Sequence, residues 1–213
     1  MLKSSRVQNE ALKTARVSGQ KRSLSQSVGH LIYLEQSPAE FVHEVFQENG
    51  FDPATKNSPN TFLKPTEKMI ADYKLELLQV FRENDVDKLR QLHQEGQSLQ
   101  CCNRFGESLI HMACRRGWTD NVKFLVNEAG VSLMVQDDYG RTPLHDACWT
   151  AEPNFELVGF LIEQVPELLL IKDVRGHTPF NYVRKEHWPV WRQFLEEQKD
   201  KLRPSKMLKI TTE

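Results

Sequence analysis

The chain has no long hydrophobic run, and its longest uninterrupted aliphatic stretch is Leu168 to Ile171. A membrane-spanning helix needs about 20 predominantly apolar residues, so we expect no segment to cross a bilayer. An excess of charge of one sign is also missing, because 28 Lys and Arg face 29 Asp and Glu, a formal net charge of -1 over 213 residues. This balance argues against a uniformly basic nucleic-acid binder and against an acidic disordered chain.

Cysteine is scarce, with four residues at Cys101, Cys102, Cys114 and Cys148. Since no secretory hydrophobic segment lies near Met1, these four do not indicate a disulfide framework, and we expect a reducing compartment. The adjacent Cys101 and Cys102 are an alternative redox-sensitive pair. Unreactive thiols are the commoner case, because reactivity needs an electropositive, exposed setting.

Catalytic signatures are absent from the sequence. It holds no Gly-rich phosphate loop, no His-Glu-x-x-His pair and no Gly-x-Ser-x-Gly nucleophile elbow. Because an enzyme also needs reactive side chains gathered in a pocket, we predict that the chain is not an enzyme and uses no cofactor and no metal.

The first 27 residues are basic, because Glu10 is their only acidic residue. Large apolar side chains are rare there, so the segment cannot bury enough surface to offset its ordering entropy. We predict a disordered basic tail over residues 1–36 and a protein of the cytoplasm or nucleus. A mitochondrial or plastid import signal is an alternative, which Glu10 disfavours. The basic residues are Lys3, Arg6, Lys13, Arg16, Lys21 and Arg22.

A helix start follows the tail. Ser37 can cap a helix, Pro38 suits the first helical position, and Glu40 can return a hydrogen bond as in a capping box. We predict an extra helix over about 38–49, followed by a proline-containing linker to residue 66. The segment 37–66 is thus expected to be one extra helix with its linker.

Three similar segments begin at Gly106, Gly140 and Gly176, at spacings of 34 and 36 residues. Three residues before each glycine stands a side chain that can organise a turn. The segments read Gly106-Glu107-Ser108-Leu109-Ile110-His111-Met112-Ala113, Gly140-Arg141-Thr142-Pro143-Leu144-His145-Asp146-Ala147 and Gly176-His177-Thr178-Pro179-Phe180-Asn181-Tyr182-Val183, and the turn residues are Asn103, Asp137 and Asp173.

This pattern resembles the ankyrin repeat, whose Thr-Pro-Leu-His-x-Ala motif stands intact from Thr142 to Ala147. Apolar pairs three residues apart extend the register into the second helices. The pairs are Leu89 with Leu92, Val122 with Leu125, Val158 with Leu161, and Trp191 with Phe194.

The resemblance implies an all-α fold, an ankyrin-repeat solenoid of stacked helix-turn-helix units with short β-turn fingers. Because one unit cannot bury its own apolar stripe, at least three are needed for stability. We expect a degenerate capping pair near 67–96 and repeats near 102–135, 136–171 and 172–203. The domain then spans 67–204, and residues 205–213 form a C-terminal tail.

Two further groups of residues allow a functional and a structural interpretation. His111 with Cys114 and His145 with Cys148 have zinc-ligand spacing, but stacked helices lie about 8–10 Å apart, too far for one ion. We favour histidines that bond to nearby backbone and cysteines that pack. The segment from Trp188 to Trp191 is either an aromatic ligand box or a plug that closes the stack, and we favour the plug.

In ankyrin repeats the residues around the turn glycine and at the end of the first helix vary and line a concave binding face. Here they include seven basic and two acidic side chains, about +5 on one face. We expect the basic and aromatic members to bind the partner. The positions are Arg104, Phe105, Glu107, Arg115 and Arg116 in the first repeat, Asp138, Tyr139, Arg141, Trp149 and Thr150 in the second, and Val174, Arg175, His177, Arg184 and Lys185 in the third.

The sequence therefore predicts a non-enzymatic protein-interaction module, an adaptor or regulator that binds an acidic, partly apolar segment of another protein. Phe105, Tyr139 and Trp149 would anchor that segment, and the arginines would steer and pair with it. The alternative is binding of nucleic acid or anionic lipid through the basic tail and the concave face.

Overall fold

The computed structural model describes residues 36–49 and 62–202. The predicted C-terminal tail, all of the predicted basic tail except Gln36, and most of the predicted linker lie outside these ranges. Within them, no helix is both long enough and apolar enough to cross a membrane.

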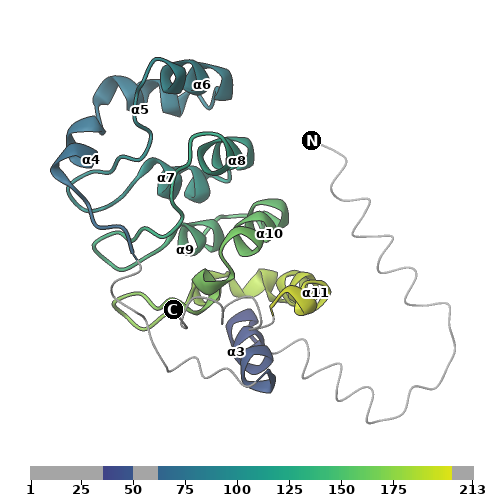
Figure 1. Cartoon of the computed structure of the whole chain (residues 1–213). Helices are drawn as coiled ribbons and strands as arrows, with labels where there is room; N and C mark the ends of the chain where they lie inside the picture. The colour runs from purple at the N-terminus through teal and green to yellow at the C-terminus, as the bar shows by residue number, and fades with distance from the viewer. Residues whose placement is uncertain (1–35, 50–61, 203–213) are drawn as a thin grey trace, which may run out of the picture. The chain divides into compact units, whose positions relative to one another are not determined.

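The described structure is mostly helical, and most of its helices form pairs that stack in order (Figure 1). Within the paired units, first helices pack on first helices, α7 on α9 and α9 on η2, so each unit covers the next. The bounds are α3 Pro38–Glu48, α4 Glu67–Asp72, α5 Leu75–Arg82, α6 Val86–Gln94, α7 Leu109–Arg116, α8 Thr119–Asn127, α9 Pro143–Cys148, α10 Phe155–Gln164, α11 Trp188–Glu197, and the short 3₁₀ helices η1 Pro166–Leu170, η2 Pro179–Tyr182, η3 Lys185–His187 and η4 Lys199–Lys201.

Each predicted turn is built by the side chain at its first position. The Oδ1 atom of Asp137 accepts the backbone N–H groups of Tyr139 and Arg141, at 3.0 and 2.8 Å. Asn103 and Asp173 make the corresponding pair of bonds in the first and third turns. These side chains replace water as partners of the turn backbone, which confirms the role predicted for them.

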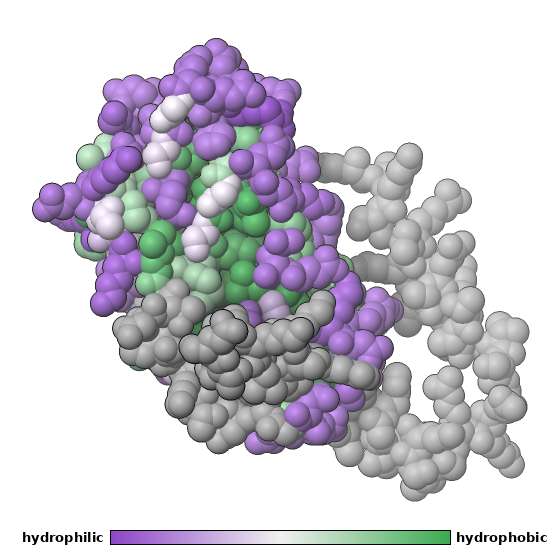
Figure 2. Space-filling model, viewed as in Figure 1, coloured by the Kyte–Doolittle hydropathy of each residue, from purple (hydrophilic) through white to green (hydrophobic). Residues whose placement is uncertain are grey.

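The core is a continuous apolar layer between first and second helices. All four predicted second-helix pairs lie in it, and of their eight side chains all but Leu92 are buried. Side chains such as Leu109, Leu144 and Leu157 have no exposed surface. Figure 2 shows hydrophobic residues, coloured green, in the middle of the facing surface with hydrophilic residues around them.

The third repeat departs from the predicted form. Its first helix is the single-turn 3₁₀ helix η2, and the chain leaves helical geometry at Val183, where φ is -67° and ψ is 131°. The last α-helix, α11, begins five residues later at Trp188, whose indole N–H donates to the carbonyl of Val183 at 3.4 Å. Terminal repeats are expected to be atypical in this way.

Residues at the end of the predicted linker join the first repeat. The backbone N–H of Leu63 donates to the carbonyl of Met134 at 2.8 Å, and Leu63 forms an isolated parallel bridge with Val135. At the capping end, the backbone N–H of Cys102 donates to the carbonyl of Met69 at 3.2 Å. The described part of the predicted linker is therefore hydrogen-bonded to the array through Leu63.

The predicted extra helix is present as α3, and its capping box is complete. The carboxylate of Glu40 accepts the backbone N–H of Ser37 at 2.8 Å, and the hydroxyl of Ser37 accepts the backbone N–H of Glu40 at 3.2 Å. Ser108 with His111, Thr142 with His145 and Thr178 with Asn181 make the same exchange at the starts of α7, α9 and η2. Thus α3 begins like the first helix of a repeat.

The apolar face of α3 covers the last unit, where it packs against η2 and α11. Phe41 and Phe46 are buried, and the guanidinium of Arg192 on α11 lies over the Phe41 ring at 3.6 Å. Trp191 is buried beneath, against Phe180 and Phe194, as the plug interpretation requires. The element that covers the C-terminal end of the stack is nevertheless α3 rather than the tryptophan segment, because α3 packs against both η2 and α11.

We expect Phe46→Ala to lower the free energy of unfolding by about 3–5 kcal/mol, because a large, fully buried aromatic side chain is replaced by a cavity. Urea unfolding followed by circular dichroism measures this. His43→Ala, an exposed position on the same helix, is the matched control and should change stability by less than about 0.5 kcal/mol. Equal stability of the two variants would show that α3 does not pack on the array.

Candidate functional site

Both motif histidines tie one unit to the next. The Nδ1 atom of His145 faces the backbone N–H of Thr142 at 3.0 Å and therefore accepts, so Nε2 carries the proton and donates to the carbonyl of His177 at 3.1 Å. His111 repeats this arrangement, with its Nε2 directed at the carbonyl of Arg141 at 3.1 Å. The predicted bond to nearby backbone is confirmed, and a bond to the following repeat adds to it.

Burial keeps these rings neutral. Loss of solvent lowers the pKa of His145 to about 4 and lowers the pKa of His111 as well. With both ring nitrogens engaged by backbone, neither histidine has a lone pair for zinc, and the described residues contain no group of three side chains placed to hold a metal ion. The neighbouring Cys114 and Cys148 are buried, as predicted for packed thiols.

The adjacent cysteines are also buried. Cys101 and Cys102 are at most 1% exposed, and burial raises the pKa of the Cys101 thiol to about 12. A reactive thiol needs an exposed, electropositive surrounding that lowers its pKa. The structure therefore favours the packed, unreactive interpretation of this pair.

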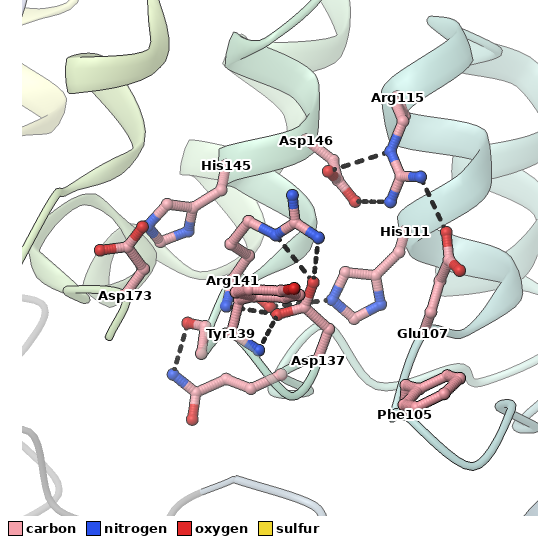
Figure 3. Close-up of polar contacts among 12 residues, drawn as sticks. Phe105, Glu107, His111, Arg115, Asp137, Tyr139, Arg141, His145, Asp146 and Asp173 are labelled. Carbon is pink, nitrogen blue, oxygen red and sulfur yellow. Dashed lines mark hydrogen bonds and ion pairs between the residues drawn. The ribbon is translucent and has the colours of Figure 1, made fainter. Parts of the chain in front are cut away.

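A cluster of aromatic and guanidinium groups lies on the second repeat (Figure 3). The Nε and Nη2 atoms of Arg141 bind the Asp137 carboxylate at 2.8 and 2.6 Å. This pair holds the guanidinium 5.1 Å from the centre of the Tyr139 ring and 5.7 Å from that of Trp149. Three predicted binding residues are thus brought together, and Asp137, which the sequence assigns only to its turn, fixes their geometry.

Arg115 is held in the same manner beside this cluster. Its guanidinium forms two bonds with Asp146, at 3.0 and 3.2 Å, and an ion pair with Glu107 at 2.8 Å. The side chain of Asp146 has no exposed surface, and burial raises its pKa although Arg115 opposes the shift. Figure 3 shows Arg115 on α7 reaching Asp146 on the neighbouring helix α9. Much of its charge is therefore balanced inside the protein.

Three aromatic side chains on this face remain half exposed: Phe105 at 49%, Tyr139 at 50% and Trp149 at 48%. Phe105 and Tyr139 lie at the tips of adjacent turns, which are joined by a hydrogen bond from the backbone N–H of Asp138 to the carbonyl of Phe105, at 2.8 Å. A pocket of about 270 Å³ opens between these turns. It is lined by Phe105, Glu107, Arg115, Asp137, Asp138, Tyr139 and Arg141.

The remaining predicted cations lie apart from this cluster. The guanidinium of Arg116 is over the Trp118 ring at 5.0 Å, and the ammonium of Lys185 is near the Trp188 ring at 5.5 Å. Arg104 lies over Phe105 at 4.6 Å. Arg175 and Arg184 are exposed in the third unit.

The charge expected for the face changes when the buried carboxylates are included. The count of seven basic and two acidic residues does not include Asp137, Asp146 and Asp173. With them the balance is seven against five, or about +2 instead of about +5. Two of these carboxylates had a visible signal, since Asp137 and Asp173 begin the turns. Asp146 occupies the variable position of the motif, where nothing in the sequence indicates burial.

Comparison with known families agrees with this architecture. A family model for ankyrin repeats, in three copies, matches residues 77–173, within the predicted domain. These residues therefore form an array of ankyrin repeats, which is a fold for binding other proteins.

Several curated relatives are similar to part of this chain. The chain is 34% identical over 79 residues to the SMC5-SMC6 complex localization factor protein 1 of Bos taurus, covering 37% of this chain and 7% of that protein. It is 33% identical over 76 residues to the putative glutaminase 2 of Caenorhabditis elegans, covering 36% and 13%. A BTB/POZ domain-containing protein 1 of Schizosaccharomyces pombe is 30% identical over 86 residues, covering 39% and 6%. The chain thus spans only a small part of each relative.

The buried histidines predict a loss of stability in mild acid. Because the pKa of His145 is about 4 when folded and about 6.5 when unfolded, the unfolded chain takes up a proton first as the pH falls. The contribution of His145 is complete above pH 6.5 and is lost toward pH 4, by about 3 kcal/mol. Urea unfolding measured across this range gives the profile.

His145→Asn is the matched variant, because Asn181 makes the same capping bonds in the third repeat. We expect lower stability at neutral pH, since the bond to the carbonyl of His177 is lost, and a flatter profile between pH 6.5 and 4. Burial of Asp146 acts in the opposite direction, so the comparison between variants isolates the histidine. Parallel profiles would contradict this assignment.

Proposed function

We propose that the chain is a non-catalytic adaptor or regulator whose concave face, the residues predicted above, binds a segment of another protein. The half-exposed row of Phe105, Tyr139 and Trp149 carries this proposal. Large aromatic side chains on rigid turns lose little conformational freedom on binding and gain much from leaving water. Their position on successive units suits a segment that runs along the array.

Arg141 strengthens this surface as a binding site. Asp137 holds its guanidinium near two of the aromatic rings, so the partner meets an arrangement that is already ordered. Arg104, Arg175 and Arg184 are exposed outside the cluster and, within the described residues, no carboxylate forms an ion pair with them. They would attract acidic residues of the partner and raise its association rate.

The name of one relative is compatible with a binding role, and we propose that this role is carried out in the cytoplasm or nucleus. The Bos taurus relative is named for localising a protein complex, and it shares a segment of 79 residues with this chain. From this name we propose only that the repeat array recognises a protein partner.

The test is quantitative affinity capture from cell extract with the full chain and with the double variant Tyr139→Ala, Trp149→Ala. We expect the double variant to lose at least about 90% of the specifically captured protein at moderate salt, because both rings near Arg141 are removed. The control is Ile70→Ala, Leu75→Ala, which removes two exposed apolar side chains of α4 and α5. Both variants should unfold at the same urea concentration as the parent chain.

Equal capture by the two double variants would refute the concave face as the binding surface. Recovery of nucleic acid or anionic lipid that moderate salt removes, with no effect of the aromatic substitutions, would instead favour the alternative function, which depends on charge.

A further inference from the structure

We propose that the groove between α3 and the turn of the third repeat binds an extended segment of a partner protein, in the place that a further turn would occupy. This surface lies outside the aromatic cluster of the concave face. The turn in question begins at Asp173 and ends at Thr178, and it is called the third turn below.

A regular hydrogen bond joins each turn to the next. The backbone N–H of Asp138 donates to the carbonyl of Phe105 at 2.8 Å, and that of Val174 donates to the carbonyl of Tyr139 at 2.9 Å. Arg175 occupies the corresponding position of the third turn. Within the described residues its carbonyl accepts no hydrogen bond, so the series of turns ends in an open acceptor.

The surroundings of the turn glycines differ in the same way between the first two turns and the third. A Cβ on Gly106 would lie 2.7 Å from the carbonyl oxygen of Gln136, and one on Gly140 would lie 3.4 Å from the Cα of Asp173. Both glycines are therefore in close contact with the backbone of the following turn. Around Gly176 nothing lies within 4 Å of the same point. Among residues 36–49 and 62–202, nothing therefore fills the space beside the third turn.

The helix α3 packs on η2 as a following first helix would, but the sequence before α3 lacks the turn signature of the three repeats. In the three repeats the residue five positions before the helix cap is Asn103, Asp137 or Asp173, with glycine three positions later. The corresponding residues before Ser37 are Ile32 and Glu35. Neither the side-chain acceptor nor the glycine that tolerates positive φ is present.

The groove has room for one side chain and a stretch of backbone, with a volume of about 380 Å³. Its apolar surface comes from Ala39 and Val42 on α3 and from Leu169 and Leu170 on η1. The charged lining residues are Glu40, Glu44 and Lys172, an excess of one carboxylate.

These features define the partner by its chemistry. An extended segment can donate a backbone N–H to the Arg175 carbonyl, as a strand does when it adds to an exposed edge. One apolar side chain of that segment would enter the groove, and the excess carboxylate favours a neighbouring Lys or Arg over Asp or Glu.

A phage-displayed library of random dodecapeptides, selected on the full chain, tests this inference. We expect selected peptides to carry an apolar residue beside Lys or Arg. The best peptide, synthesised and titrated by fluorescence anisotropy, should bind at least about tenfold more weakly to Ala39→Arg, whose long side chain fills the groove. Methylation of the peptide nitrogen that pairs with Arg175 should weaken binding similarly.

Ala71→Arg is the matched control, an exposed alanine on α4 at the other end of the array, and it should bind the peptide like the parent chain. Urea unfolding must show that Ala39→Arg is folded. A selection without binders, or binders unaffected by Ala39→Arg, would overturn the inference.

Other occupants of the groove give distinct results. Peptides that are lost with Tyr139→Ala, Trp149→Ala but not with Ala39→Arg sit on the concave face, which supports the proposed function and refutes this inference. A dimer in sedimentation analysis that Ala39→Arg abolishes would assign the groove to a second copy of the chain and refute it too.

Discussion

The structure depends on one constraint: a single helix pair cannot cover its own apolar stripe, so each unit is stable only when another unit packs on it. The interactions that matter most therefore lie between units. Leu109, Leu144 and Leu157 are enclosed only because neighbouring helices stack. The hydrogen bonds from His111 and His145 to carbonyls of the next unit fix how adjacent units align, because each ring must face one particular carbonyl.

The same constraint separates structural from binding residues. Side chains that point between units must be apolar or fully hydrogen-bonded, as the neutral histidines and the Arg115–Asp146 pair are. Side chains at the turn tips face no neighbouring unit and are under no such requirement. Phe105 and Tyr139 are exposed there without a structural need, which is the physical reason to associate them with a partner.

The sequence predicted those parts of the fold that repeat. The turn residues Asn103, Asp137 and Asp173, the helix caps and the buried pairs of the second helices recur at fixed spacing, so one intact motif identified the others. The start of α3 was also predictable, because a capping box is local in sequence. Its packing on α11 was not, since that contact joins a helix that precedes the array to the last α-helix of the array, and no periodicity connects them.

The candidate site was predicted only in its exposed members. Variable positions identified Tyr139, Arg141 and Trp149, but their mutual arrangement depends on the Asp137 carboxylate. The sequence assigns that residue only to its turn. Asp146 shows the same limit, because burial of a charged side chain depends on a partner from another repeat and not on its own sequence neighbours.

The position of α3 has a consequence for the synthesis of the chain. This helix leaves the ribosome before every repeat, whereas α11, on which it packs, is among the last elements to be made. At typical translation rates, the apolar face of α3 remains without its packing partner for on the order of 10 s. Phe41 and Phe46 are therefore exposed to chaperones and to other nascent chains throughout translation of the array. The contact between α3 and α11 can form only after α11 has been synthesised.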